Sequence, residues 1–190
     1  MGDRNIHSNQ TLRICFCGIM TAIIFVANYL RIPFMGTSVH MTNALCAIAG
    51  LLFGPGLGFV AAGLGSGLYD VMVGYGAESL ITLVTKGMIA LIAGLIASGV
   101  KRKHSVKAGD VVRAVLACVA GALTYVALYM LKTYIFGMFV NGLGLDGTLV
   151  KMGTKLPGSL INALFASVAG PILFFALKPA LDHAGLLEKM

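Results

Sequence analysis

Long apolar stretches follow one another along most of this chain, and its polar residues gather between them. A helix needs about 20 mainly apolar residues to cross a bilayer. The stretch from residue 42 to residue 73 is too long for one crossing, and a proline flanked by glycines at 54–56 divides it, because both residue types interrupt helices. The six predicted helices cover residues 12–30, 43–53, 57–73, 78–100, 111–136 and 155–177.

The segments between these stretches predict the connections. Residues 31–41 form a first outer loop, and the glycine-rich, weakly apolar segment 137–154 forms a second. Lys178-Pro179 ends the last helix, since proline does not continue a helix that has lost its apolar pattern. The second helix is short for a full crossing, so we expect it to be tilted or partly embedded among its neighbours.

Composition supports a membrane protein. The chain has 190 residues, of which 58% are hydrophobic and only 11% are charged. A soluble domain carries about a quarter charged residues, so this chain cannot cover a water-facing surface. Its length fits one domain. The predicted fold class is therefore an all-α integral membrane protein, a six-helix bundle in a single transmembrane domain over residues 1–190.

The positive charges gather in three places, the N-terminal arm, one central loop and the C-terminal tail. They are Arg4, Arg13, Lys101, Arg102, Lys103, Lys107, Arg113, Lys178 and Lys189. With alternating spans these all lie on one side, which predicts cytoplasmic termini by the positive-inside rule. The central run KRKH at 101–104 is also compatible with binding RNA or anionic lipid. Because an apolar span flanks it on each side, we favour its interpretation as a cytoplasmic loop that sets the topology.

Small residues recur four positions apart in the predicted spans, as in Gly50/Gly54, Gly63/Gly67 and Ala90/Gly94. Such pairs let helix backbones approach closely in lipid, and most of them fit internal packing. The pair Gly18/Ala22 in the first helix is our candidate for a face that docks on a partner protein.

Ionisable residues inside a membrane are costly and mark functional sites. Asp70, Glu78 and Lys86 qualify, and Lys86 lies eight residues into its helix, about 12 Å along the axis, too deep to reach the headgroups cheaply. Further polar residues fall in the same outer half: His40, Asn43, Tyr69, Tyr75, Tyr129, Lys132, Tyr134, Lys155, Ser159 and Asn162.

Structural explanations compete with a binding role at several of these positions. Tyr129 and Tyr134 also fit an interfacial aromatic belt. Lys132 and Lys155 also fit lysines that extend to the headgroups. Asp70 and Lys86 also fit an internal ion pair. The alternative explains all of these residues together: they line a cavity in the outer half of the membrane that binds a small, flat, polar ligand.

Motifs for catalysis are missing from the sequence. It has no phosphate-binding G-x-x-x-x-G-K-[ST] loop, no H-E-x-x-H and no G-x-S-x-G. Its four cysteines lack C-x-x-C spacing, and it has no evident chain of buried carboxylates for proton coupling. We therefore predict no enzyme activity, no catalytic residue, no cofactor and no metal.

Several short motifs occur in a characteristic order: Val39-His40, then GLLFGP at 50–55, AAGLGSG at 61–67, Asp70, Gly74-Tyr75 and Lys86-Gly87. In this order the chain resembles the substrate-binding S components of energy-coupling factor (ECF) vitamin transporters, in the branch for riboflavin, hydroxymethylpyrimidine or vitamin B6. The resemblance covers essentially the whole chain.

The resemblance implies a six-helix bundle with a vitamin pocket near the outer face, capped by the first outer loop. It also implies a membrane partner, the T component, and two cytoplasmic ATPases that supply energy. Family members dock through an A-x-x-x-A motif in the first helix, where this chain has Gly18 and Ala22. Relatives often carry asparagine and glutamine where this chain has Ser159 and Asn162.

We therefore expect the substrate-capture subunit of an ECF-type importer in the cell membrane. The favoured ligand is a vitamin B6 form or hydroxymethylpyrimidine, with riboflavin or another heterocyclic micronutrient as the alternative; a stand-alone secondary transporter is a further alternative. The expected substrate-binding residues are His40, Asn43, Asp70, Tyr75, Glu78, Lys86, Ser159 and Asn162. Among them, Lys86 and Asp70 orient ring heteroatoms, Tyr75 stacks on the ring and His40 belongs to the lid.

Overall fold

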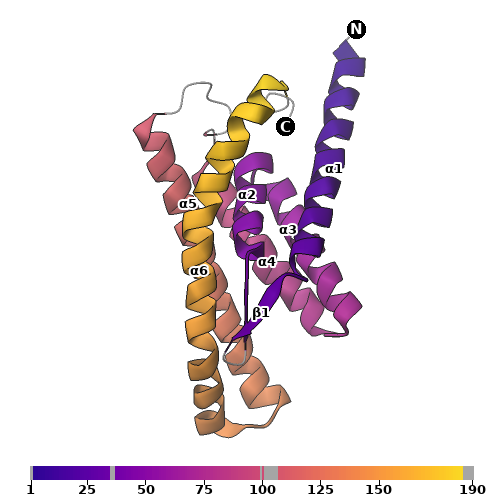
Figure 1. Ribbon diagram of the computed structural model, residues 1–190. Helices are drawn as coiled ribbons and strands as arrows, with labels where there is room; N and C mark the ends of the chain where they lie inside the picture. Colours follow the sequence, from indigo (N-terminus) through magenta and orange to yellow (C-terminus); the bar gives the residue numbers. More distant parts are fainter. Residues whose placement is uncertain (1, 35–36, 99, 101–106, 186–190) are drawn as a thin grey trace.

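The computed structural model describes residues 2–34, 37–98, 100 and 107–185, and these are almost entirely helical (Figure 1). The elements are α1 (Gly2–Ala27), β1 (Arg31–Phe34), β2 (Thr37–His40), α2 (Thr42–Phe53), α3 (Pro55–Val73), α4 (Glu78–Ile96), α5 (Ala108–Ile135), the π-helical turn η2 (Phe136–Val140) and α6 (Gly144–His183). Within this described part, α1, α3, α4, α5 and α6 are long and apolar enough to span a membrane, whereas α2 is shorter. The six predicted helices are confirmed, but α1 begins at Gly2 and ends at Ala27, whereas it was expected to cover residues 12–30. The basic segment at 101–103 and Lys189 lie outside the described residues.

Two predicted boundaries of the last helix are wrong. The segment 144–154, expected to be part of a loop, belongs to α6, which continues past Pro179 to His183. Packing explains the early start, because buried Thr148 lies against Gly137 of η2, where a Cβ atom would come within 2.6 Å of the threonine hydroxyl. The proline is accommodated because neighbouring groups in a bundle can satisfy the freed backbone atoms. The helix expected to end at residue 100 ends at Ile96.

The expected first outer loop is a β-hairpin. β1 and β2 pair antiparallel, with Arg31 opposite His40 and Phe34 opposite Thr37. The hairpin lies in the half of the bundle away from the start of α1 and the end of α6 (Figure 1). α2 follows it directly and runs into the centre of the bundle, where it contacts α3, α4 and α6.

Close backbone contacts hold α2, α3 and α4 together. A Cβ atom at Gly94 would lie 2.6 Å from the backbone nitrogen of Pro55, and one at Gly58 would lie 2.8 Å from the Cα of Gly50. A Cβ atom at Gly50 would collide with the backbone of Ala90. Gly54 joins α2 to α3 at φ +82°, a conformation that glycine adopts without strain. The predicted packing through small residues is therefore confirmed at Gly50 and at the Ala90/Gly94 pair.

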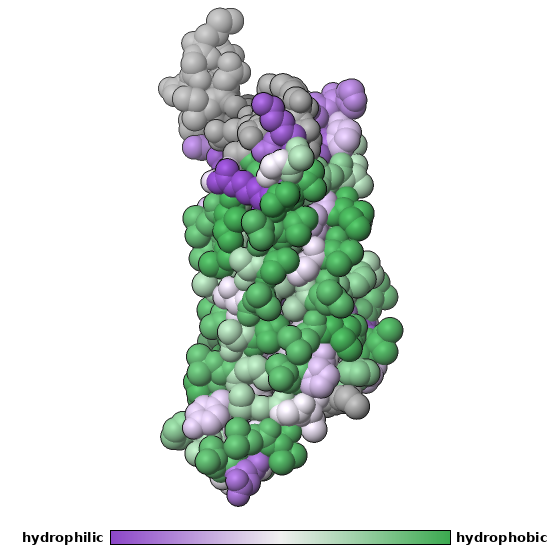
Figure 2. Space-filling model, turned by 90° about the vertical axis from the view of Figure 1, so that its left-hand side faces the viewer, coloured by the Kyte–Doolittle hydropathy of each residue, from purple (hydrophilic) through white to green (hydrophobic). Residues whose placement is uncertain are grey.

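The outer surface of the bundle is apolar. Figure 2 shows hydrophobic residues over most of the height of one face, with hydrophilic residues concentrated near its two ends. Large apolar side chains are exposed on each of the long helices, such as Ile19, Leu80, Leu116 and Leu164. Lipid is the environment in which such a surface is stable.

Candidate ligand-binding site

A cavity of about 360 Å³ lies between the hairpin and the surrounding helices. All fifteen residues that line it carry a polar atom in the side chain, although 58% of the chain is hydrophobic. They are Asn28, Arg31, Thr37, Ser38, His40, Tyr69, Asp70, Tyr75, Glu78, Thr82, Lys86, Tyr125, Tyr129, Lys132 and Lys155. Such a lining suits a polar, water-soluble ligand, and the volume falls at the small end of the usual range for ligand sites.

Lys86 is the most deeply buried charged residue of this cavity, with 4% of its surface exposed. Its Nζ donates a hydrogen bond to Asn43 Oδ1, lies 3.5 Å from His40 Nε2 and lies 4.6 Å from the ring centre of Tyr125. No carboxylate of the described residues is within the 4.0 Å ion-pair distance of this nitrogen. The alternative in which Asp70 and Lys86 form an internal ion pair is therefore not observed.

His40 connects the hairpin to Lys86. Burial lowers the pKa of His40 well below its ordinary value of 6.5, and the neighbouring cations Lys86 and Arg31 act in the same direction. The imidazole is therefore neutral at pH 7. When Lys86 donates to Nε2, the ring proton is on Nδ1, and this buried atom has no hydrogen-bond partner.

Tyrosines from α5 form one wall of the cavity. The rings of Tyr125 and Tyr129 stack with centres 5.7 Å apart and planes 13° apart, because residues four apart lie on the same face of a helix. Lys155 Nζ lies 5.5 Å from the ring centre of Tyr129. These two tyrosines offer aromatic surface against which a flat ring can pack.

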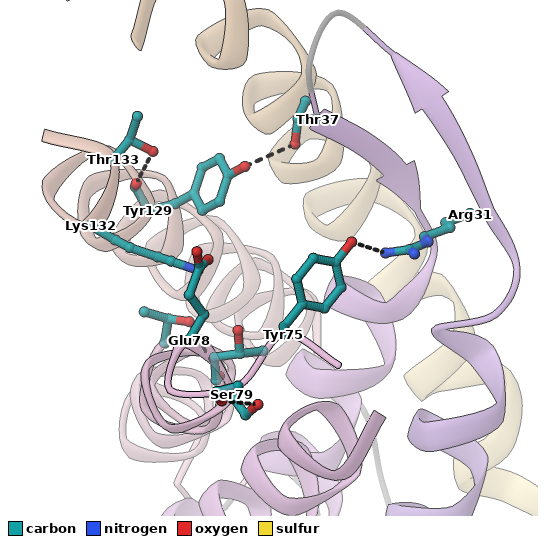
Figure 3. Close-up of polar contacts among 11 residues, drawn as sticks. Arg31, Thr37, Tyr75, Glu78, Ser79, Tyr129, Lys132 and Thr133 are labelled. Carbon is teal, nitrogen blue, oxygen red and sulfur yellow. Dashed lines mark hydrogen bonds and ion pairs between the residues drawn. The ribbon is translucent and has the colours of Figure 1, made fainter. Parts of the chain in front are cut away.

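Polar contacts join different elements around the cavity (Figure 3). Lys132 of α5 and Glu78 of α4 form an ion pair with Nζ and Oε2 2.6 Å apart. The guanidinium of Arg31 lies 5.2 Å from the ring centre of Tyr69, and its Nη1 is 3.4 Å from the hydroxyl of Tyr75. These contacts connect β1 and α5 to the α3–α4 region.

Asn162 of α6 fixes the hairpin. Its Oδ1 accepts a hydrogen bond from the backbone N–H of His40 at 2.9 Å, and its Nδ2 donates to the carbonyl oxygen of Ser38 at 2.7 Å. A third contact joins the hydroxyls of Thr37 and Tyr129 at 3.2 Å. The position of the hairpin over the cavity therefore depends on α5 and α6.

The eight residues expected to bind substrate fall into two groups. Five line the cavity: His40, Asp70, Tyr75, Glu78 and Lys86. Three do not: Asn43 lies behind Lys86 as its hydrogen-bond acceptor, the Ser159 hydroxyl donates to the Leu156 carbonyl of its own helix, and Asn162 bonds the hairpin backbone.

Sequence reasoning missed other residues of the lining. The predicted site does not include six further lining residues, which are Asn28, Arg31, Thr37, Ser38, Thr82 and Tyr125. The spacing of Tyr125 and Tyr129, one helical turn apart, was the signal that would have found Tyr125. Tyr129, Lys132 and Lys155, for which structural explanations competed, all line the cavity, whereas Tyr134 does not.

The candidate docking face lies on α1. Cys17, Met20 and Ile24 are buried, and α1 packs mainly on α3. Gly18 and Ala22 are exposed, and a Cβ atom at Gly18 would meet nothing within 4 Å. This face is therefore uncovered within the described chain.

The chain is similar to several known proteins. A family model described as "ECF-type riboflavin transporter, S component" matches residues 8–179. A UPF0397 protein of Streptococcus gordonii is 27% identical over 177 residues, which cover 90% of each chain. An uncharacterised protein of Pyrococcus woesei is 32% identical over 92 residues, 47% of this chain and 62% of that protein.

A solved structure has the same fold. It is described as the S component of a bacterial ECF transporter and matches with a TM-score of 0.64 at 14% identity, covering 90% of this chain and 98% of the other.

Proposed function

Because the chain belongs to the family of ECF-type riboflavin transporter S components, we propose that it captures a small vitamin or vitamin precursor at the outer face of the membrane. It is a multi-pass protein of the plasma membrane and a substrate-binding transporter component, not an enzyme. The observation that carries the proposal is the cavity of about 360 Å³ lined only by residues with polar side-chain atoms, inside a bundle whose long helices each expose large apolar side chains.

The ligand of this proposal is a flat heterocycle. Stacked Tyr125 and Tyr129 pack against its ring, and Tyr75 at the cavity wall does the same from the α3–α4 turn. Lys86 and Asp70 orient its heteroatoms by hydrogen bonds. A vitamin B6 form or hydroxymethylpyrimidine is the favoured ligand, and riboflavin is the alternative.

The hairpin acts as the lid in this proposal. His40 and Thr37 of β2 line the cavity, and Asn162 holds the strand from α6. A ligand enclosed by the hairpin is separated from water, which strengthens its polar contacts.

Energy comes from partners in this proposal: a T component in the membrane and two cytoplasmic ATPases. The exposed Gly18/Ala22 face of α1 docks on the T component, since small residues allow close approach of a second helix. The ligand is then released to the cytoplasm, on the side where α1 begins and α6 ends.

Ligand binding by the purified protein tests the site. We expect Lys86→Ala and Asp70→Ala each to weaken binding of the preferred vitamin at least tenfold, as measured by titration calorimetry with pyridoxine, hydroxymethylpyrimidine and riboflavin. Ser167→Ala is the control, because its hydroxyl bonds only the Ala163 carbonyl of its own helix. If both variants bind all three compounds like the wild type, the cavity is not the binding site.

A further inference from the structure

The cavity carries an excess of positive charge. Four cations line it, Arg31, Lys86, Lys132 and Lys155, against two carboxylates, Asp70 and Glu78. With His40 neutral, this leaves two formal positive charges without a counterpart in the lining. Burying unmatched charge of one sign is unfavourable unless another group compensates for it.

Aromatic rings take the place of carboxylates beside three of the four cations. Only Lys132 has a carboxylate of a described residue within 4.0 Å, that of Glu78. Lys86 lies over Tyr125 and Lys155 over Tyr129, at 4.6 and 5.5 Å from the ring centres. A ring face stabilises a cation without neutralising it, so the charge on these two lysines is free to attract an anion.

The polar atoms around Lys86 also favour a ligand that offers hydrogen-bond acceptors. Lys86 donates to Nε2 of His40 and to Oδ1 of Asn43. The remaining ring nitrogen of His40, which lines the cavity, is Nδ1, a buried hydrogen-bond donor without an acceptor. A group rich in acceptor oxygens complements this part of the protein better than a donor does.

We propose that the ligand is a flat heteroaromatic anion, with a carboxylate or phosphate that binds at Lys86 and Lys155 while its ring packs on Tyr125 and Tyr129. This inference rests on the proposed function and adds the charge of the substrate to it. An anionic ligand excludes some forms of a vitamin and admits others. The free alcohol forms of these heterocycles are neutral, whereas their acid and phosphate forms are anionic. Charge, more than ring type, then decides which compound binds.

Matched compounds that share a ring and differ in charge test this inference. We use 4-pyridoxate and pyridoxine 5′-phosphate against pyridoxine, hydroxymethylpyrimidine phosphate against hydroxymethylpyrimidine, and FMN against riboflavin. None of these pyridoxine derivatives has an aldehyde that would react with a lysine. Titration calorimetry on the purified full chain gives the ratio of the neutral to the anionic dissociation constant in each set. We expect a ratio of at least ten in the set that binds most tightly. Comparing 4-pyridoxate, a carboxylate, with pyridoxine 5′-phosphate then shows which anionic group the site prefers.

Variants locate the charge that produces this preference. We expect Lys86→Met and Lys155→Met each to reduce the ratio at least tenfold, while Lys151→Met leaves it unchanged, because Lys151 lies one turn earlier on α6 and does not line the cavity. Lys155→Met remains informative if the buried Lys86 variant fails to fold.

The outcomes separate the two proposals. A wild-type ratio near or below one, with tight binding of a neutral compound, overturns the anionic ligand and leaves the vitamin-capture function in place. A preference for anions that survives both lysine variants overturns the assignment to Lys86 and Lys155. If no compound in any set binds, the proposed capture of these vitamins fails, and the inference about charge fails with it.

Discussion

Replacing Asn162 with alanine removes the two hydrogen bonds that join α6 to the hairpin. Each bond contributes about 0.5–1.5 kcal/mol net. The free energy that favours the docked over the open hairpin therefore falls by about 1–3 kcal/mol. This corresponds to an opening equilibrium shifted about 5- to 150-fold at 25 °C. Only 1% of Asn162 is exposed, so water does not replace these bonds while the hairpin remains docked.

Hydrogen exchange of the hairpin measures this shift. The backbone amide of His40 should exchange faster in Asn162→Ala by at least this factor, because it loses its own acceptor, Asn162 Oδ1, and the hairpin also opens more easily. A bound ligand should dissociate faster as well, since the hairpin encloses the cavity. Ser167→Ala on the same helix serves as the control and should exchange like the wild type at this amide.

One result contradicts the reasoning directly. If His40 exchanges at the wild-type rate in Asn162→Ala, and ligand dissociates no faster, then α6 does not hold the hairpin in solution. A general loss of structure is recognised separately, because it would accelerate exchange in α2 and α3 as much as in the hairpin.

Three further predictions follow from the fold. Gly94→Ala should destabilise the protein by about 1–3 kcal/mol, because the added methyl group overpacks against Pro55, and should therefore lower its melting temperature. Gly153→Ala, with open space at its Cβ, should not lower it; equal melting curves for the two variants would refute the close contact. Gly18→Leu should leave ligand binding intact but abolish uptake into cells that contain the partner subunits, while Gly18→Ala should retain it; uptake by both variants excludes this face as the docking site. Because the pKa of His40 is lowered by burial, the folded state binds its proton less readily, so stability should fall as pH drops below about 6.5; the same fall in His40→Gln would assign it to another group.

The helices were predictable because each requires an apolar run of a certain length, and lipid imposes that requirement locally. The hairpin was not, since its strands have four residues each and its position depends on Asn162, more than 120 residues away. The start of α6 was misread for a related reason. Weak hydropathy and glycines at 144–154 suggested a loop, whereas contact between Thr148 and Gly137 stabilises a helix there.

The site was predictable where a residue is costly to bury. Lys86, Asp70 and Glu78 stood out by charge alone, and all line the cavity. Tyr125 did not stand out, because a tyrosine in a membrane helix is ordinary, and only its stacking on Tyr129 shows its place. Only the three-dimensional structure shows that Lys86 lines the cavity, whereas Asn43 lies behind it and accepts its hydrogen bond.

The length of α6 has a consequence for how this helix lies in the membrane. A helix of 40 residues is about 60 Å long, roughly twice the thickness of the hydrocarbon layer. Even a tilt of about 40°, the upper end of the usual range, leaves more than ~10 Å of it outside that layer. The surplus length therefore extends α6 beyond the hydrocarbon layer at one or both of its ends, so its terminal turns lie among the headgroups or in water.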